Sequence, residues 1–273
     1  MTTPDFFAAA VALLFGLLIG SFLNVCIHRW PRGRSVVRPR SHCVRCRKTI
    51  PWYDNIPVVS YILLGGQCRY CKRKISPRYP LVELSTGVLF FWLVWTLGPT
   101  LAALKMCIFT AMLLALVFCD LEKRILPDQF TLGGSVIGIG FAFFVPVPDI
   151  TAQAVLWVFG VHLTGKGQSL AEAAFGSLLP AAFMWSGGWL YEKIRHREGL
   201  GLGDVKLIIM VGAFLGLRGA LQTMILGCVS GLIIGYGYIR ATHKDASTYE
   251  LPFGSFLGLA GLVVALWGPK LAG

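Results

Sequence analysis

The sequence predicts an all-α integral membrane protein, a polytopic helical bundle of about eight transmembrane segments. Of its 273 residues, 55% are hydrophobic and only 14% are charged, and the mean hydropathy is +0.67. Because a soluble globular domain has roughly 25% charged residues, this composition excludes a soluble domain, a disordered chain and a coiled coil. A helix that crosses a bilayer needs about 20 mostly apolar residues, and the chain contains several such stretches.

Eight apolar stretches are candidate membrane spans. They are 6–27, 81–97, 101–119, 130–147, 171–191, 205–217, 220–239 and 252–268. The sixth is short for a full crossing, so a tilted or re-entrant segment is the alternative there. No basic residue precedes the first stretch, which predicts a retained anchor rather than a cleaved signal peptide.

Basic residues are concentrated between the first two stretches. Residues 29–78 hold 13 of the 25 lysines and arginines and a single acid, Asp54. With this loop in the cytoplasm, alternation of the spans puts 21 of the 25 inside, which is the expected bias. The net charge of +12 therefore indicates orientation, and docking on anionic lipids is a second interpretation. Nucleic acid is not an expected partner, because the loop lacks regularly spaced aromatics.

Four cysteines in this loop form two CxxC pairs. Cys43 pairs with Cys46 and Cys68 pairs with Cys71, with 21 residues between the pairs. Four thiolates on two turns satisfy a tetrahedral zinc ion, although the gap slightly exceeds the usual one. Disulfides or a redox dithiol are the competing interpretations, and both fit a reducing compartment poorly. The pattern predicts a structural, zinc-ribbon-like site with His42 as a bystander.

Two acids lie at the predicted cytoplasmic edge of the membrane. Asp120 ends an apolar stretch in FCDLEKRILPD, and Asp204 begins another in GLGLGDVK. Two carboxylates held close at a partly desolvated interface tend to share one proton. The ionised one then activates water while the protonated one donates a hydrogen bond to a scissile carbonyl. Asp120 and Asp204 are therefore the predicted catalytic pair of an aspartic protease.

Neighbouring residues are candidates for supporting this pair. Gly201 and Gly203 lack side chains, so an extended substrate strand can approach Asp204; an ordinary glycine-rich loop is the alternative. Lys206 is predicted either to orient Asp204 or to be a plain interfacial lysine. Asp128 is a third acid on the same predicted face.

Some other motifs do not indicate a catalytic site. Gly254 and Gly258 lie four residues apart, a spacing that predicts close helix packing in lipid. Residues 160–166 fit GxxxxGK by count, but glycine follows the lysine and no strand is predicted before it, which excludes a P-loop. The chain contains no GxSxG, HExxH or GxGxxG motif.

Taken together, these strings resemble the prepilin peptidase family, the type IV leader peptidases of bacterial pilus and type II secretion systems. The similarity spans nearly the whole chain and rests on GSFLNVCIHRWP (20–31), both CxxC pairs, DNIPVVSY (54–61), ISPRYPLVEL (75–84), both aspartate strings and LPFGSFLGLA (251–260). Val44 replaces a proline often found inside the first CxxC of the family. This change leaves the thiol ligands in place.

The resemblance implies a bifunctional enzyme of the bacterial inner membrane. Such proteins cut the leader of prepilins and pseudopilins after a glycine at the cytoplasmic face, then N-methylate the new terminus with S-adenosylmethionine. By motif, Asp120 and Asp204 take the catalytic roles and the four cysteines take the zinc roles. The implied organisation is a first transmembrane segment (1–27), a zinc loop with a methyltransferase part (28–80) and a GxGD aspartic peptidase domain (81–273).

Glu83 is the candidate residue for methyl transfer. It begins the second predicted span close to the zinc loop, and the hypothesis is that it binds the substrate amine; pairing with a loop arginine is the alternative. No nucleotide-binding strand–helix unit is present, so S-adenosylmethionine rests on the resemblance. The rival function is a non-enzymatic assembly or transport component whose acid pair binds ions and whose zinc loop docks a partner.

Overall fold

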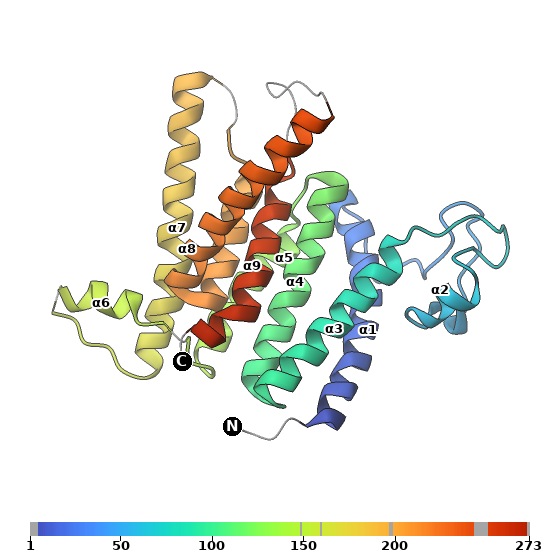
Figure 1. Cartoon of the computed structure of the whole chain (residues 1–273), viewed down its shortest axis with the longest axis horizontal. Helices are drawn as coiled ribbons and strands as arrows, with labels where there is room; N and C mark the ends of the chain where they lie inside the picture. Colours follow the sequence, from blue (N-terminus) through green and yellow to red (C-terminus); the bar gives the residue numbers. More distant parts are fainter. Residues whose placement is uncertain (1–4, 148, 159, 197–198, 243–250, 272–273) are drawn as a thin grey trace. The chain divides into compact units, whose positions relative to one another are not determined.

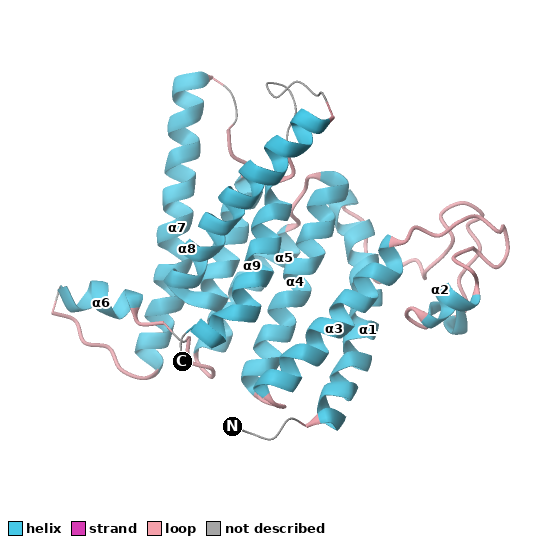
Figure 2. Cartoon of the chain, viewed as in Figure 1, coloured by secondary structure: helices cyan, strands magenta, loops and turns pink. Residues whose placement is uncertain are grey.

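The computed structural model describes residues 5–147, 149–158, 160–196, 199–242 and 251–271. Within these ranges the regular elements are helices joined by loops (Figure 2). The extended pairings there are two isolated bridges, His42 with Thr49 and Gln67 with Lys74. The helices are α1 (Phe6–Arg29), η1 (Trp30–Arg32), η2 (Trp52–Asn55), α2 (Val59–Leu63), α3 (Arg78–Leu97), α4 (Leu101–Lys123), α5 (Asp128–Ala142), α6 (Thr151–Val158), α7 (Lys166–Arg195), α8 (Leu202–Ala241) and α9 (Phe253–Leu271). The predicted all-α class is confirmed.

Among the described residues, four helical stretches are long and apolar enough to cross a bilayer. They are Phe6–Arg32, Arg78–Leu97, Leu101–Lys123 and Leu202–Tyr238, and Phe253–Trp267 is a shorter apolar helix. The chain is therefore a multi-pass membrane protein, while the count of eight spans stays a prediction. By its internal contacts the chain divides into two units, Met1–Ala115 and Leu116–Gly273; the domain boundaries at 27 and 80 also stay predictions.

In the first unit, glycines let α1 and α3 approach closely. A Cβ on Gly16 would lie 2.7 Å from the Cα of Gly87, and one on Gly20 would lie 2.7 Å from the Cα of Glu83. Such contacts associate helices in lipid through van der Waals packing. Because Gly20 has no side chain, the backbone of Glu83 lies directly against α1.

In the second unit, α8 is a hairpin of two halves rather than one straight helix. Gly216 breaks it, with φ 77° and ψ −173°, a conformation that glycine adopts without strain. Gly254 of α9 lies beside Asp204 in the first half, and Leu257 of α9 lies beside Gly227 in the second. Both halves thus run along α9, and Figure 1 shows them in orange, side by side. The reversal keeps Asp204 level with the start of α9.

Asp149 stabilises the turn of this hairpin. Its Oδ2 accepts a hydrogen bond of 2.8 Å from the Arg218 N–H, and its Oδ1 accepts one of 3.1 Å from the Thr151 N–H. One buried carboxylate therefore caps both α6 and the second half of α8, where backbone N–H groups lack helical partners. The two halves correspond to the predicted stretches 205–217 and 220–239.

Candidate active site and metal centre

Asp120 and Asp204 meet on either side of Gly254. A Cβ on Gly254 would lie 3.0 Å from Asp204 Oδ1 and 3.2 Å from Asp120 Cγ. Asp120, near the end of α4, is 5% exposed, and Asp204 is partly buried in the first turn of α8. The structure thus brings the two predicted acids together around the open side of Gly254.

The start of α9 holds the Asp120 side chain. The backbone N–H and the hydroxyl of Ser255 both donate hydrogen bonds to Asp120 Oδ2, at 2.6 Å and 2.7 Å. Ser255 is 3% exposed. Among the described residues, none donates a hydrogen bond to Asp120 Oδ1 or to the Asp204 carboxyl group. The two acids therefore lie in different surroundings.

Sequence reasoning missed both Gly254 and Ser255. The open side of Gly254 faces the two carboxyl groups and Leu126, whose Cδ1 is 2.9 Å from the Cβ position, so this glycine allows close packing, and it does so against the two acids. In the sequence, Ser255 is an ordinary serine within LPFGSFLGLA (251–260). A serine that directly follows Pro-Phe-Gly at the start of an apolar helix, on the predicted face of the acids, is the signal that indicates it.

The glycines before Asp204 differ in what they face. A Cβ on Gly201 would lie 3.4 Å from Asp204 Oδ2, whereas one on Gly203 would lie 3.3 Å from Leu126. Gly201 has extended dihedral angles and immediately precedes α8. The backbone at Gly201 thus lies directly against the second oxygen of Asp204, and Gly203 provides room for Leu126.

Lys206 and Asp128 contact each other. Lys206 Nζ lies 2.7 Å from Asp128 Oδ1, and the two side chains are 34% and 55% exposed. The pair joins the first turns of α5 and α8, so Lys206 acts on the neighbouring helix rather than directly on Asp204. An exposed ion pair of this kind contributes about 0–1 kcal/mol to stability.

The four cysteines of the two CxxC pairs form one cluster. Their Sγ atoms all lie within 4.8 Å of one another, and those of Cys43 and Cys71 are 3.8 Å apart. Those of Cys46 and Cys68 are 4.0 Å apart, far beyond the roughly 2.05 Å of a disulfide bond. The set has the composition and size of a metal site. His42 does not join it, since its Nδ1 lies 3.0 Å from the Arg40 carbonyl.

Both CxxC pairs have the same local backbone. In the first, the Cys43 N–H donates to the Lys48 carbonyl and the Arg47 N–H donates to the Cys43 carbonyl. The second repeats this, from Cys68 to Arg73 and from Lys72 to Cys68. Arg47 and Lys72 both have positive φ, 58° and 55°. Each turn therefore presents its two thiols on one side, without help from a hydrophobic core.

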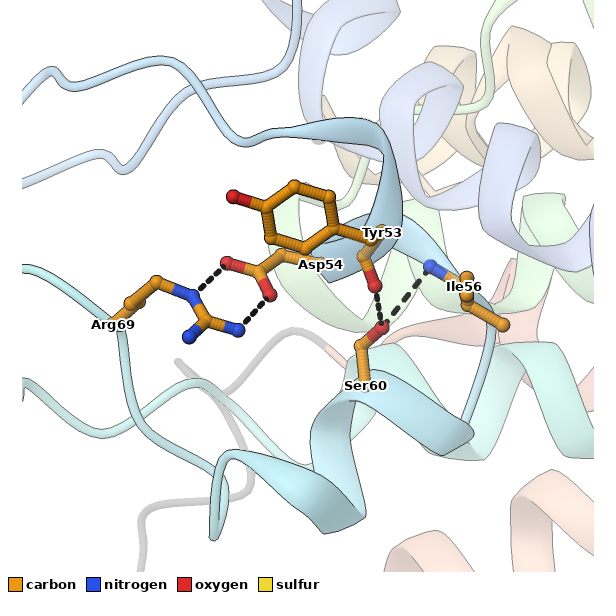
Figure 3. A network of polar contacts seen from close by, with 5 residues as sticks. All are labelled: Tyr53, Asp54, Ile56, Ser60 and Arg69. Atoms are coloured by element: carbon orange, nitrogen blue, oxygen red, sulfur yellow. Dashed lines mark hydrogen bonds and ion pairs between the residues drawn. The ribbon is translucent and has the colours of Figure 1, made fainter.

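An ion pair ties the second turn to the segment before α2. Arg69 donates to Asp54 through two hydrogen bonds of 2.7 Å and 2.6 Å, and the Ser60 hydroxyl donates to the Tyr53 carbonyl at 2.8 Å (Figure 3). The hydrogen bonds from Arg69 hold the pKa of Asp54 below its ordinary value. The only acid in the basic loop is therefore committed to a structural contact.

Glu83 is buried between α1 and the loop. Its Oε2 accepts a hydrogen bond of 2.8 Å from the Val58 N–H, and its carboxylate also interacts with the Ser21 side chain. Glu83 is 8% exposed, and these contacts replace the pairing with a loop arginine that the sequence left open. Val58 has φ 62°, which is strained for a β-branched residue.

Two cavities lie beside these groups. One cavity, of about 360 Å³, is lined in part by Ser21, whose side chain interacts with Glu83, and by Pro57, which precedes Val58. Asn55 and Arg40 also line it. The other, of about 500 Å³, is an apolar groove along α7, the second half of α8 and α9. It is lined by Phe183, Met184, Gly187, Gly188, Tyr191, Gly199, Leu200, Met224, Cys228, Phe253 and Leu257. Two of its lining residues, Leu200 and Phe253, directly precede Gly201 and Gly254, whose Cβ positions lie within 3.4 Å of the Asp204 carboxyl group.

Comparison with known proteins agrees with this arrangement. The family model for the bacterial peptidase A24 N-terminal domain matches residues 14–97, and that for the type IV leader peptidase family matches residues 107–236. No solved structure matches the chain significantly. The two matched regions contain the cysteine cluster with Glu83 and the two aspartates, respectively.

Curated relatives described as prepilin leader peptidase/N-methyltransferase match almost end to end. The one from Pseudomonas aeruginosa is 34% identical over 282 residues, covering 95% of this chain and 90% of its own length. That from Aeromonas salmonicida is 33% identical, with 96% and 91% covered, and that from Stutzerimonas stutzeri is 32% identical, with 99% and 96% covered. The chain therefore belongs to the type IV leader peptidase family, among the prepilin leader peptidase/N-methyltransferases.

Proposed function

We propose that this protein cleaves the leader of prepilins and pseudopilins after a glycine and then N-methylates the new amino terminus. The observation that carries the peptidase half is the meeting of Asp120 and Asp204 across Gly254. The relatives are described as prepilin leader peptidase/N-methyltransferases, and this description supports the substrate class and the methylation step. The two activities match the two family regions of the chain.

The peptidase reaction needs only the two carboxyl groups and one water. The ionised carboxylate takes a proton from the water, whose oxygen attacks the scissile carbonyl, while the other carboxyl donates its proton to the carbonyl oxygen. Collapse of the resulting diol breaks the C–N bond, and the amine leaves with a proton. Each carboxyl returns to its starting state, so no covalent enzyme intermediate forms.

The test is cleavage of a purified prepilin by the protein in liposomes. Asp120→Asn and Asp204→Asn should each lose cleavage at least a thousandfold, because each removes one of the two proton-transfer groups. Lys206→Gln is the matched control, since it removes only the exposed pair with Asp128. If both Asn variants still cleave, or the wild type does not, the rival function as an assembly or transport component stands instead.

The membrane topology that we propose follows from the distribution of basic residues. We place the chain in the bacterial inner membrane with residues 29–78 and both aspartates at the cytoplasmic face, because basic loops stay on that side. The hairpin of α8 would supply two of eight spans, the first of them short. Cysteine labelling from either side of the membrane, at Val44 and at Val161, tests this arrangement in intact cells.

We assign the four-cysteine cluster to structural zinc. A tetrahedral ion with Zn–S bonds of about 2.3 Å sets the sulfurs roughly 3.8 Å apart, and the 3.8 Å and 4.0 Å separations are close to that value. Thiolate-only ligation favours a soft metal over magnesium or calcium. Bound metal would supply folding free energy to a loop with few aliphatic residues.

For methyl transfer we propose that Glu83 binds the amine of the cleaved substrate. S-adenosylmethionine, when bound, supplies an electrophilic methyl group on a positively charged sulfur. Glu83 fits such a site, because it is a buried carboxylate whose only described donors are Val58 and Ser21. The adjacent cavity of about 360 Å³ offers both apolar walls and Arg40, which suits a carboxylate-bearing cofactor.

A binding measurement separates this role from a structural one. Glu83→Gln keeps the shape and one acceptor oxygen, so it should lower methylation of an already cleaved pilin while leaving leader cleavage intact. Equilibrium binding of the cleaved pilin peptide should weaken at least tenfold, and an N-acetylated peptide should bind both proteins equally. Unchanged peptide affinity in Glu83→Gln would leave Glu83 with a structural role only.

A further inference from the structure

The two aspartates of the site are not equivalent, because one residue of α9 touches only one of them. We propose that the Gly254–Ser255 turn is a positioning element that holds Asp120 as the ionised, water-activating base and leaves Asp204 as the proton-carrying acid. This inference rests on the proposed peptidase function. It adds a division of labour that neither the family nor the pairing of the acids specifies.

Ser255 favours the charged form of Asp120. Both of its donors, the backbone N–H at 2.6 Å and the hydroxyl at 2.7 Å, converge on Oδ2, and hydrogen bonds to a carboxylate stabilise its ionised form. The N–H comes from the first turn of α9, whose dipole also favours a negative charge there. Arg124, four residues beyond Asp120, adds a positive charge on the same side.

Asp204 lacks comparable support. Its carboxyl group receives no hydrogen bond from the described residues and lies beside Gly201 and Gly254. Asp204 lies in the first turn of α8, so a helix dipole acts on both acids, and the two hydrogen bonds from Ser255 distinguish them. With Asp120 already ionised across Gly254, a second negative charge is unfavourable. The proton therefore resides on Asp204.

The described charged groups that act on Asp120 are few. Asp204 faces it from α8, and Arg124 follows it at the end of its own helix. The described part of α9 contributes only the neutral donors of Ser255. Removing the hydrogen bonds from Ser255 should therefore destabilise the ionised form of Asp120 and leave Asp204 unaffected.

Gly254 sets the distance between the two acids. Any Cβ there would press on both carboxyl groups and on Leu126 Cδ1, at 3.0, 3.2 and 2.9 Å. Asp120 cannot withdraw easily, because Ser255 holds it. The turn thus combines a residue that must be small with one that must donate two hydrogen bonds.

This arrangement assigns each atom in the reaction. Asp120 Oδ1, which is not used by Ser255, takes the proton from water, and the proton on Asp204 goes to the carbonyl oxygen as the new C–O bond forms. In the collapse, Asp120 returns its proton to the departing amine nitrogen. Asp204 recovers a proton from the diol hydroxyl that becomes the product carbonyl, so no other reactant is required.

The test uses Ser255→Ala, which removes the hydroxyl donor, and Ser255→Thr, which keeps both donors. Ser255→Ala should lower kcat for leader cleavage about tenfold with KM nearly unchanged, since a hydrogen bond to a charged group is lost from the base. Ser255→Thr should restore most of kcat. Methylation of a pre-cleaved pilin should be the same in all three proteins, which controls for folding and membrane insertion.

The pH profile of kcat decides which acid Ser255 serves. Loss of support for the base should move the acidic limb of the Ser255→Ala profile to higher pH and leave the basic limb in place. Movement of the basic limb instead would overturn the assignment, because Asp120 would then be the acid. Wild-type rates in Ser255→Ala would remove the positioning role altogether.

Gly254→Ala tests the spacing. It should lower cleavage at least a hundredfold, whereas Gly231→Ala, whose Cβ would meet Phe256 at an ordinary 3.6 Å, should cleave normally. Full activity in Gly254→Ala would contradict the proposal. If the wild type itself fails to cleave, the proposed function fails, and that outcome is distinct from every result above.

Discussion

Cys43 Sγ lies 3.8 Å from Cys71 Sγ, so the first cysteine of one CxxC pair meets the last cysteine of the other. The two pairs are interleaved around one point, and each is shaped by its own backbone turn. A single ion at that point would join segments that share little apolar contact. We therefore expect a bound ion to hold the basic loop in a defined structure.

Removing one thiol should release this loop. Cys71→Ser is expected to lose nearly all bound zinc, measured by elemental analysis of the purified protein, and residues 42–74 should become sensitive to trypsin, because the metal no longer offsets chain entropy. Cys228→Ser changes an exposed cysteine outside the cluster and should keep one zinc per chain. Equal zinc content in the two variants would exclude the four-cysteine site.

The Asp54–Arg69 pair should make the loop sensitive to acid. Since the pKa of Asp54 is lowered in the folded protein by Arg69, the pair stabilises the loop above the ordinary Asp range of about pH 4. That stabilisation is lost as the pH falls through the folded value. Hydrogen exchange at residues 52–69 should therefore rise on acidification.

The control for this prediction is Asp54→Asn, in which Arg69 has no charged partner. Its exchange should already be faster at neutral pH and should show a smaller rise on acidification than the wild type, at matched zinc content. Parallel curves for the two proteins would mean that the pair contributes nothing to the loop.

Filling the apolar groove should weaken substrate binding without harming the fold. At Gly187, a Cβ would meet no atom within 4 Å, and leucine has a higher helix propensity than glycine. Gly187→Leu should raise KM for a full-length prepilin several-fold, if its apolar helix occupies the groove, and leave kcat largely unchanged. Cleavage of a short soluble leader peptide should not change.

Gly140→Leu is the matched control for the groove. Gly140 is also a helical glycine with open space at its Cβ position, but it lies on α5 and does not line the groove. A similar rise in KM in both variants would point to a general effect of added bulk in the membrane and not to a substrate groove.

Asp149 should control the stability of the second unit. Asp149→Ala removes the caps of α6 and of the second half of α8, each worth about 0.5–2 kcal/mol, so the unfolding temperature in detergent should fall measurably. Asp149→Asn keeps one acceptor oxygen and should lose less. Unchanged thermal stability in both variants would show that the turn of the hairpin does not depend on this carboxylate.

Much of this organisation was predictable from local patterns. The composition predicted a helical membrane protein, since apolar helices satisfy their own backbone in lipid. The motif strings predicted the family, and the CxxC spacing predicted that Cys43, Cys46, Cys68 and Cys71 would gather. The two scarce acids on one predicted face also predicted that Asp120 and Asp204 would meet.

Other features depend on long-range contacts. Ser255 is an ordinary serine in the sequence, and it becomes a partner of Asp120 only because the α8 hairpin brings the start of α9 beside the end of α4. Gly254 has the spacing of a packing glycine, yet in the fold it faces two carboxyl groups. Lys206 follows Asp204 by two residues but points to Asp128.

The hydropathy of a helix and the spacing of cysteines or acids in a short segment can be read without knowing the fold. The sequence alone therefore determined the fold class, the family, the four-thiol cluster and the acid pair. The tertiary structure decided which groups support each acid and how Glu83 is held by Val58 and Ser21. Hydrogen bonds between residues far apart in the chain depend on helix ends being brought together by packing. No local pattern specifies that geometry.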